Sequence, residues 1–161
     1  MEEGRIQASR PSRTQGGEKV RKGVRTLRGS LEPNEIRQLV VDDGIFTNGL
    51  RITFFSVWQS QLGAGLTAVG CLSTNDRILS AALLPANEPA VFAWSAMSTG
   101  NATDIQVGSF DRIDPDHVVN EELFIHNRAG TDLEYLIVCE PYTMSEDEGV
   151  LQLVKNKQQS V

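Results

Sequence analysis

Short runs of apolar and β-branched residues recur along the chain from residue 36 onward, and Gly, Pro, Asn and Asp separate them. The spacing of these runs, about 8 to 15 residues, is typical of antiparallel sandwiches and barrels and not of alternating strands and helices. We therefore predict an all-β fold, a jelly-roll-like antiparallel β-sandwich of about seven or eight strands, although an immunoglobulin-like sandwich or a small barrel fits the spacing equally well. The predicted strands are residues 36–41, 50–58, 66–72, 90–96, 105–110, 123–125 and 135–139, and residues 78–84 read as either a strand or a helical turn.

The strongest strand signal is the segment LRITFFSVW at residues 50–58. Both of its faces carry apolar residues, which predicts a central strand or a strand whose outer face meets another subunit. Simple alternation places on one face Leu50, Ile52, Phe54 and Ser56, and on the other Arg51, Thr53, Phe55 and Val57.

The last two apolar runs flank a turn-forming segment, residues 127–132. Two strand-like runs joined by a short polar loop predict an antiparallel hairpin between residues 123–125 and residues 135–139. The segment before this hairpin, residues 111–117, is polar and contains Pro115, so we expect it to be an ordered loop.

The C-terminal segment has a different pattern. Residues 145–148 (SEDE) have the spacing of a capping box, and Val150, Leu151 and Val154 form an apolar stripe behind it. This pattern predicts a short helix, while Gly149 weakens it and leaves an extended tail as the alternative.

The N-terminal segment, residues 1–30, has no apolar periodicity and too little apolar surface to offset chain entropy. We expect it to be an extended arm that is disordered in isolation. The predicted organisation is thus an arm at residues 1–30, a sandwich at residues 31–144 and a helix or tail at residues 145–161.

Charge separates the arm from the rest of the chain. Residues 1–30 contain 8 basic and 3 acidic side chains, a net charge of +5, and the other residues contain 7 basic and 18 acidic side chains, a net charge of −11. A basic arm before an acidic body is typical of an interaction tail for nucleic acid or for an acidic neighbouring subunit. The candidate interaction residues are Arg5, Arg10, Arg13, Lys19, Arg21, Lys22, Arg25 and Arg28.

Composition bounds the domain count and the compartment. The 161 residues, 40% of them hydrophobic, are enough for one core, and no run approaches the roughly 20 apolar residues that cross a membrane. No apolar run follows a basic start at the N-terminus, so we expect no secretory leader and synthesis in a cytoplasm. In a reducing compartment Cys71 and Cys139 are expected to be buried thiols rather than a disulfide.

Motifs of the common enzyme classes are absent from the sequence, which contains no GxGxxG, no GxxxxGK[ST], no GxSxG and no HxH or HExxH pair. One polar cluster offers metal-binding or acid–base chemistry, through carboxylate oxygens and one imidazole: Asp111, Asp114, Asp116 and His117. Aspartates in loops ordinarily bond nearby backbone N–H groups, so we interpret the cluster as a structural turn. We predict no enzymatic activity, no cofactor and no bound metal, with these four residues as the metal candidates.

Two further residue types are candidates for binding. We expect His126 at the surface or at an interface, because it lies at the end of a predicted strand. The aromatic residues fall inside apolar runs and are expected in the core rather than on a stacking platform: Phe54, Phe55, Trp58, Phe92 and Trp94.

The stretch FDRIDPDHVVNEELFIHN (residues 110–127), followed by YLIVCEPYTMSEDEGVLQLVKNKQQS (residues 135–160), resembles small virion structural proteins of bacteriophages from aquatic bacteria. In that family an IDPDHVV-like segment precedes a strand, an acidic segment and an apolar-basic tail, so the resemblance covers about the last third of the chain. It identifies no catalytic residue. It implies a β-sandwich that builds or decorates a capsid, made in the host cytoplasm and located in the virion.

The first hypothesis is therefore a non-enzymatic capsid cement, decoration or minor capsid protein, a homo-oligomer whose arm contacts other capsid subunits or packaged nucleic acid. A major jelly-roll coat protein or a tail or fibre component are variants of this hypothesis. The second hypothesis is a soluble nucleic-acid or carbohydrate binding module with an exposed aromatic groove. The third is a metal-dependent enzyme centred on Asp114, Asp116 and His117.

Overall fold

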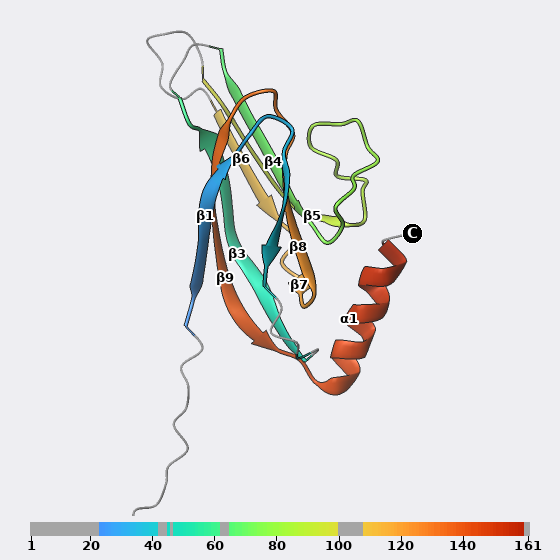
Figure 1. Ribbon diagram of the computed structural model, residues 1–161. Coiled ribbons are helices and arrows are strands. Elements are labelled where there is room, and N and C mark those ends of the chain that lie inside the picture. Colours follow the sequence, from blue (N-terminus) through green and yellow to red (C-terminus); the bar gives the residue numbers. More distant parts are fainter. Residues whose placement is uncertain (1–22, 42–44, 46, 62–64, 100–107, 160–161) are drawn as a thin grey trace, which may run out of the picture.

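The computed structural model describes residues 23–41, 45, 47–61, 65–99 and 108–159, which contain nine strands and one helix. The strands form two antiparallel sheets that face each other (Figure 1), one ordered β1-β9-β3-β7 and the other β2-β8-β4-β5-β6. The predicted all-β sandwich is confirmed. The elements are β1 (Arg25–Leu31), β2 (Ile36–Val40), β3 (Asn48–Gln59), β4 (Thr67–Ser73), β5 (Val91–Ser98), β6 (Gly108–Ile113), β7 (Val118–Val119), β8 (Glu122–Asn127), β9 (Leu133–Thr143) and α1 (Glu146–Gln159).

Strand pairing is nested from the ends of the chain toward its middle. β1 pairs with β9, β2 with β8, β3 with β7 and β4 with β5, always antiparallel. The chain is thus a two-stranded ribbon that doubles back at the connection from β4 to β5. Further pairs, β9 with β3 and β8 with β4, roll the ribbon into two sheets, and β6 extends the second sheet beyond β5.

The core lies between the sheets and consists of side chains that face inward from both. Phe55 and Ile137 come from the four-stranded sheet, and Leu72, Phe92 and Ile125 come from the five-stranded sheet. Fully burying one such side chain contributes roughly 1.5–3 kcal/mol to folding. Contacts between segments far apart in the sequence therefore hold the sandwich together.

Strand β3 departs from simple alternation at Thr53. Ile52 lies opposite Cys139, and Phe54 lies opposite Val138, the adjacent residue of β9, so Thr53 is the extra residue of a β-bulge. After the bulge Phe55 is fully buried on the same side as Ile52, whereas Phe54 is 43% exposed. The predicted division of faces is therefore wrong beyond Ile52, because one extra residue moves every following side chain to the opposite face.

The predicted hairpin between residues 123–125 and 135–139 does not form. These residues belong to β8 and β9, which lie in different sheets, so the connection crosses the end of the sandwich. The Asn127 side chain holds this crossing: its Nδ2 donates to the carbonyl oxygens of Glu32 (2.7 Å) and Thr131 (2.8 Å), and its Oδ1 accepts from the amide of Ala129 (2.9 Å). The two strands were identified correctly and their pairing was not.

The sandwich begins earlier in the chain than predicted, at strand β1. Leu31 is buried, Leu27 packs against the core, and Gly29 lies over the ring of Tyr135. A Cβ at Gly29 would lie 2.9 Å from the Tyr135 hydroxyl oxygen, so only glycine fits there without a shift of the tyrosine. The glycine interrupts the period-2 pattern of the two leucines, which is why the sequence places the arm boundary at residue 30 although the strand starts at Arg25.

The connection from β4 to β5, residues 74–90, lies over the outer face of the five-stranded sheet. Arg128 Nη2 donates to the carbonyl oxygens of Ser80 (2.7 Å) and Ala82 (2.8 Å), and Trp94 Nε1 donates to the carbonyl oxygen of Pro85 (3.2 Å). Residues 78–84 form neither the strand nor the helical turn considered from the sequence. Side chains of the sheet therefore position this long connection.

Helix α1 follows β9 and confirms the predicted C-terminal helix. Ser145 Oγ accepts from the amide of Glu148 (3.3 Å), and the Glu148 carboxylate accepts from the amide of Ser145 (2.9 Å), which is the reciprocal pairing of a capping box. The apolar stripe of Val150, Leu151 and Val154 is exposed. Among the described residues no helix has the length and apolar character needed to cross a membrane.

Candidate functional site

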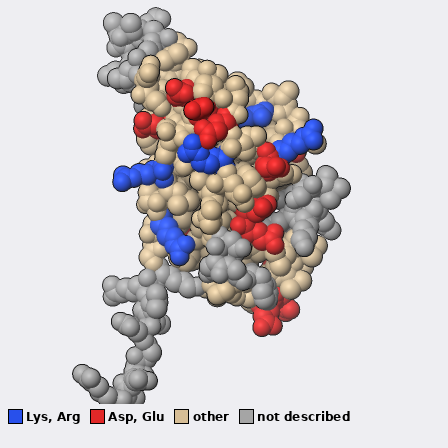
Figure 2. All heavy atoms as spheres, viewed as in Figure 1, with Lys and Arg blue, Asp and Glu red and all other residues tan. Residues whose placement is uncertain are grey.

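Two of the predicted arm cations, Arg25 and Arg28, lie on strand β1, and both are exposed. The other six, from Arg5 to Lys22, lie outside the described residues. Figure 2 shows basic and acidic side chains interspersed over one face of the sandwich, with no continuous basic patch among the described residues of that face. The described residues of this face therefore offer no preformed basic surface for nucleic acid.

The residues of the predicted acidic cluster do not form one site, because Asp111 lies in β6 and the others lie in the turn that follows it. Asp111 is part of β6, not of a loop, and its Oδ1 accepts from Ser95 Oγ (2.5 Å), which in turn accepts from the amide of Val57 (2.9 Å). Because Val57 lies in β3 and Ser95 in β5, this hydrogen-bonded chain connects the two sheets. Asp111 thus serves the sandwich interior rather than a surface site.

The remaining members of the cluster form a tight turn between β6 and β7. Asp114 Oδ1 accepts from the amide of Asp116 (3.1 Å), and the amide of Asp114 donates to the carbonyl oxygen of Phe92 (2.7 Å). The His117 ring stacks on Phe92 with centroids 3.9 Å apart, and burial lowers the pKa of His117 to about 4, so the imidazole is neutral. The described residues contain no group of three or more His, Cys, Asp or Glu that could hold a metal ion.

The structure brings together one Ser–His pair that the sequence analysis did not identify. Ser73 Oγ lies 2.7 Å from His126 Nε2, and both residues are fully buried, at 0% and 1% exposure. The prediction that His126 is a surface or interface residue is wrong, because the connection at residues 74–90 covers it. The two residues are 53 positions apart, and only the register of β8 against β4 brings them together.

Hydrogen-bond geometry determines what the Ser73–His126 pair can do. Ser73 Oγ donates to the carbonyl oxygen of Asn75 (2.5 Å), and His126 Nε2 lies 3.1 Å from the same oxygen. A hydroxyl has one proton, so the ring nitrogen must carry its own proton and donate toward Ser73 and Asn75. An imidazole that donates to the serine cannot act as its general base. The pair therefore anchors the start of the β4–β5 connection instead of forming a nucleophile.

The cysteines offer no nucleophile either. Cys71 and Cys139 are free and buried, as predicted. Burial raises the pKa of the Cys71 thiol to about 12, and it also raises the pKa of the Cys139 thiol. A thiol that stays protonated at neutral pH is a poor nucleophile and a poor metal ligand.

The aromatic residues occupy different environments. Phe55 and Phe92 are core residues, as predicted, whereas Phe54 is exposed because of the bulge. Trp58 lies on β3 and Trp94 on β5, in different sheets; their Nε1 atoms donate to the Glu134 carboxylate (3.1 Å) and to a backbone carbonyl oxygen of the β4–β5 connection. The two indoles therefore do not form one stacking platform.

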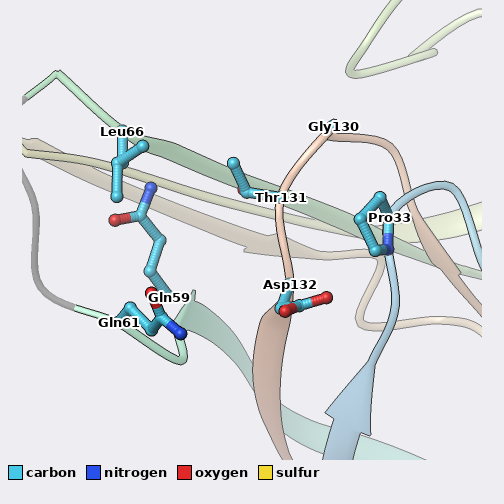
Figure 3. Close-up of a pocket in the computed structure, with 7 residues that line it drawn as sticks. All are labelled: Pro33, Gln59, Gln61, Leu66, Gly130, Thr131 and Asp132. Carbon is cyan, nitrogen blue, oxygen red and sulfur yellow. The ribbon is translucent and has the colours of Figure 1, made fainter.

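A pocket of about 250 Å³ opens at the end of the sandwich where three connections meet (Figure 3). Gln59, the last residue of β3, lines one side with Leu66, and the turn at Thr131 and Asp132 lines the other. Gln59 is only 7% exposed, and neither its Oε1 nor its Nε2 has a hydrogen-bond partner. The pocket thus presents an unpaired donor and acceptor, which suits binding of a polar group, and the described residues that line it include no histidine and no cysteine.

Large apolar side chains are exposed on several elements. They lie on the edge strand β2, on the outer face of β3, on the β4–β5 connection and on helix α1. Single exposed apolar side chains are normal on protein surfaces, so only a place where several of them adjoin marks a candidate contact surface. The most exposed of these residues are Val40 (90%), Leu79 (71%), Leu151 (61%), Val24 (61%) and Leu83 (56%).

Comparisons of the chain with models of protein families, with curated proteins and with solved structures found no match.

Proposed function

We propose that this chain is a non-enzymatic virion structural protein, a capsid cement, decoration or minor capsid protein whose sandwich is a jelly roll. The observation that carries the proposal is the nested pairing of β1 with β9, β2 with β8, β3 with β7 and β4 with β5. A two-stranded ribbon rolled into two facing sheets is the arrangement of jelly rolls, which viral capsid proteins, lectins and cupins use.

The chemistry of the side chains favours the capsid use of this arrangement. A cupin-type centre needs several imidazoles facing one cavity, and the two histidines of the chain are stacked on Phe92 in one case and bonded to Ser73 and Asn75 in the other. A lectin-type groove needs exposed aromatic faces side by side, and Trp58 and Trp94 lie on different sheets. Subunit contacts need exposed apolar surface, which β2, β3 and α1 provide.

The basic arm gives the second part of the proposal. Six of its eight cations precede β1, an edge strand of the four-stranded sheet, so the chain enters the sandwich at an edge that a neighbour can approach. The rest of the chain carries a net charge of −11, which complements an arm donated by another copy. We propose that the arm contacts adjacent capsid subunits or the packaged nucleic acid, in a particle assembled from chains made in the host cytoplasm.

The proposal can be tested by looking for this chain in virus particles purified from the source of the sequence. An antibody raised against the purified chain should detect it in density-gradient-purified particles, at many copies per particle, and immunogold labelling should decorate the particle surface or the broken shell. Detection of the chain in infected cells but not in particles would overturn the proposal. Labelling confined to tails or fibres would move the assignment from the capsid to those parts, and a shell composed mainly of this chain would make it the major coat protein.

A further inference from the structure

Strand β2 is an edge strand of the five-stranded sheet and pairs only with β8 among the described strands (Figure 1). The amide of Asn127 donates to the carbonyl oxygen of Glu35 (2.8 Å), which places these two residues opposite each other as a hydrogen-bonded pair. Hydrogen-bonded and non-hydrogen-bonded pairs alternate along an antiparallel ladder. The backbone N–H and C=O groups of Ile36, Gln38 and Val40 therefore point away from β8, toward the open edge.

The outer face of β2 carries no charged side chain that would protect this edge. Natural edge strands usually carry lysine, proline, a bulge or an inward-pointing charge that prevents pairing with another chain. In β2 Ile36 is 49% exposed and Val40 is 90% exposed, and both share the outer face with Gln38. The one charged residue of the strand, Arg37, lies on the inner face with Leu39, and its charge is neutralised by the Glu35 carboxylate, to which Nε (2.9 Å) and Nη2 (2.6 Å) donate.

The outer-face residues of β2, Ile36, Gln38 and Val40, are symmetric about Gln38, with one β-branched apolar side chain on each side of it. We propose that β2 pairs antiparallel with β2 of a second copy of this chain, across a twofold axis that passes between the two Gln38 residues. Ile36 then lies opposite Val40 of the partner subunit, and the reverse pair forms at the other end. Two five-stranded sheets become one continuous sheet, an isologous contact that buries the same patch on both copies.

Neighbouring registers are less favourable. An axis at Arg37 places two guanidinium groups directly opposite each other, and like charges in that position are destabilising. An axis at Leu39 moves Ile36 beyond the last residue of the partner's strand and leaves it unpaired. The register centred on Gln38 alone uses the outward-pointing backbone groups of Ile36, Gln38 and Val40 in both copies.

Strand β1, an edge strand of the four-stranded sheet, is unsuited to the same kind of self-pairing. Self-pairing of β1 about its central residue would place Arg28 opposite Arg28 of the partner subunit, and both would be exposed. β1 therefore carries on its exposed face a charge that the outer face of β2 lacks.

The surface beside β2 extends the proposed contact. Ile36, Ala81 and Leu83 line a hollow of about 270 Å³ between β2 and the β4–β5 connection, and Leu83 is 56% exposed. In the proposed register Val40 of the partner subunit lies opposite Ile36, next to this hollow. Arg128 holds the connection through the carbonyl oxygens of Ser80 and Ala82, so the apolar surface is formed before a partner arrives. Preorganisation of this kind lowers the entropy cost of association.

This inference deepens the proposed function, because it names the edge through which copies of a capsid-associated subunit join. Pairing through β2 does not involve the basic arm. High salt or removal of the arm should therefore leave this pairing intact, which separates it experimentally from contacts that the arm makes.

Proline at position 38 gives the sharpest test. The backbone amide of Gln38 faces the open edge, so Gln38→Pro removes a backbone hydrogen bond between copies without removing a backbone hydrogen bond to β8. The side-chain hydrogen bond from Gln38 Nε2 to Glu122 Oε1 (3.3 Å) is lost in this variant and in its control alike. Gln38→Ala is the matched control, since it keeps the amide and loses only the side chain. In 0.5 M salt, light scattering on the full chain should give twice the chain mass of 17.7 kDa for the wild type and for Gln38→Ala, and the single mass for Gln38→Pro. Circular dichroism melts should show that all three are folded.

A second pair of variants covers the case in which Gln38→Pro fails to fold. Val40→Lys places a charge on the proposed contact, and Val150→Lys places the same charge at an exposed valine of α1. We expect Val40→Lys to weaken association at least tenfold and Val150→Lys to leave it unchanged. A folded Gln38→Pro or Val40→Lys chain that keeps the wild-type mass would overturn the inference, as would a wild-type chain that stays single at every concentration. Either result would leave the proposed function standing if the chain is still found in virus particles.

Discussion

At the scale of single residues, Gln59 combines deep burial with an amide that has no partner. A buried polar group without a hydrogen bond costs roughly 1–3 kcal/mol, and methionine has a similar length without that cost. We expect Gln59→Met to raise the free energy of unfolding by about 1–2 kcal/mol in urea titrations. Gln61→Met, at an exposed residue lining the same pocket, is the control and should change little. A lower stability of Gln59→Met would mean that water or a ligand satisfies the amide, and the pocket would then be a binding site.

The two histidines predict how stability depends on pH. Burial lowers the pKa values of His117 and His126 to about 4, below the value of 6.5 for an exposed histidine. The unfolded chain therefore binds more protons between pH 6.5 and pH 4, so stability is complete above pH 7 and is lost as the pH falls through this window. From pH 7 to pH 5 each histidine should reduce the free energy of unfolding by about 2 kcal/mol.

Urea titrations at pH 7 and pH 5 measure this loss, and most carboxylates remain ionised over that range. The variant His126→Gln cannot titrate and keeps a donor that can reach Asn75, so it should show about half the wild-type loss. A wild-type chain with equal stability at both pH values would contradict the burial of the two imidazoles.

At the scale of elements, the bulge in β3 determines which side chains fill the core. Deleting Thr53 removes the extra residue and leaves Ile52, Phe54 and Phe55 on their present faces, so the chain should remain folded and lose about 1 kcal/mol or less. Deleting Ser56, in the same strand beyond the bulge, moves Val57 to the outer face and should abolish cooperative unfolding. Thermal melts of the two deletion variants compare these outcomes. Equal damage from both deletions would show that Thr53 is not the extra residue.

The elements also show which parts of the fold the sequence could predict. Alternating or continuous apolar runs revealed most of the strands, and the spacing of Ser145 and Glu148 revealed the helix, because these signals are local. Strand partners depend on segments far apart: nothing near residues 123–125 indicates that β8 pairs with β2 and β4 rather than with β9. Gly29 hid β1 for a different reason, since a residue without a side chain gives no apolar signal although its position is inward.

The polar sites also divide into those that depend on local sequence and those that depend on segments far apart in the chain. The turn at Asp114 was predictable because the carboxylate bonds a backbone amide two residues away. The Ser73–His126 pair and the pocket at Gln59 were not, since each is assembled from strands and connections that only the completed sandwich brings together.

At the scale of the whole molecule, β1 is part of the sandwich, so the sandwich includes residues from Arg25 onward and not only those from residue 31. A chain that begins at Gly23 keeps β1, and its unfolding midpoint should equal that of the full chain. A chain that begins at Glu32 lacks Leu27 and Leu31, which pack against the core, and should lose roughly 3–6 kcal/mol from these two side chains.

A comparison of the full chain with the chain that begins at Gly23 isolates what the arm contributes. Removing residues 1–22 deletes six cations, so any association of the full chain with DNA or with acidic surfaces that weakens as salt increases should disappear from the chain that begins at Gly23. Association through β2 involves backbone hydrogen bonds and apolar side chains, which salt does not screen, and should persist in that shorter chain. Light scattering at 0.05 M and 0.5 M salt distinguishes the two contributions. If the shorter chain loses all association at both salt concentrations, the arm rather than the β2 edge joins the subunits.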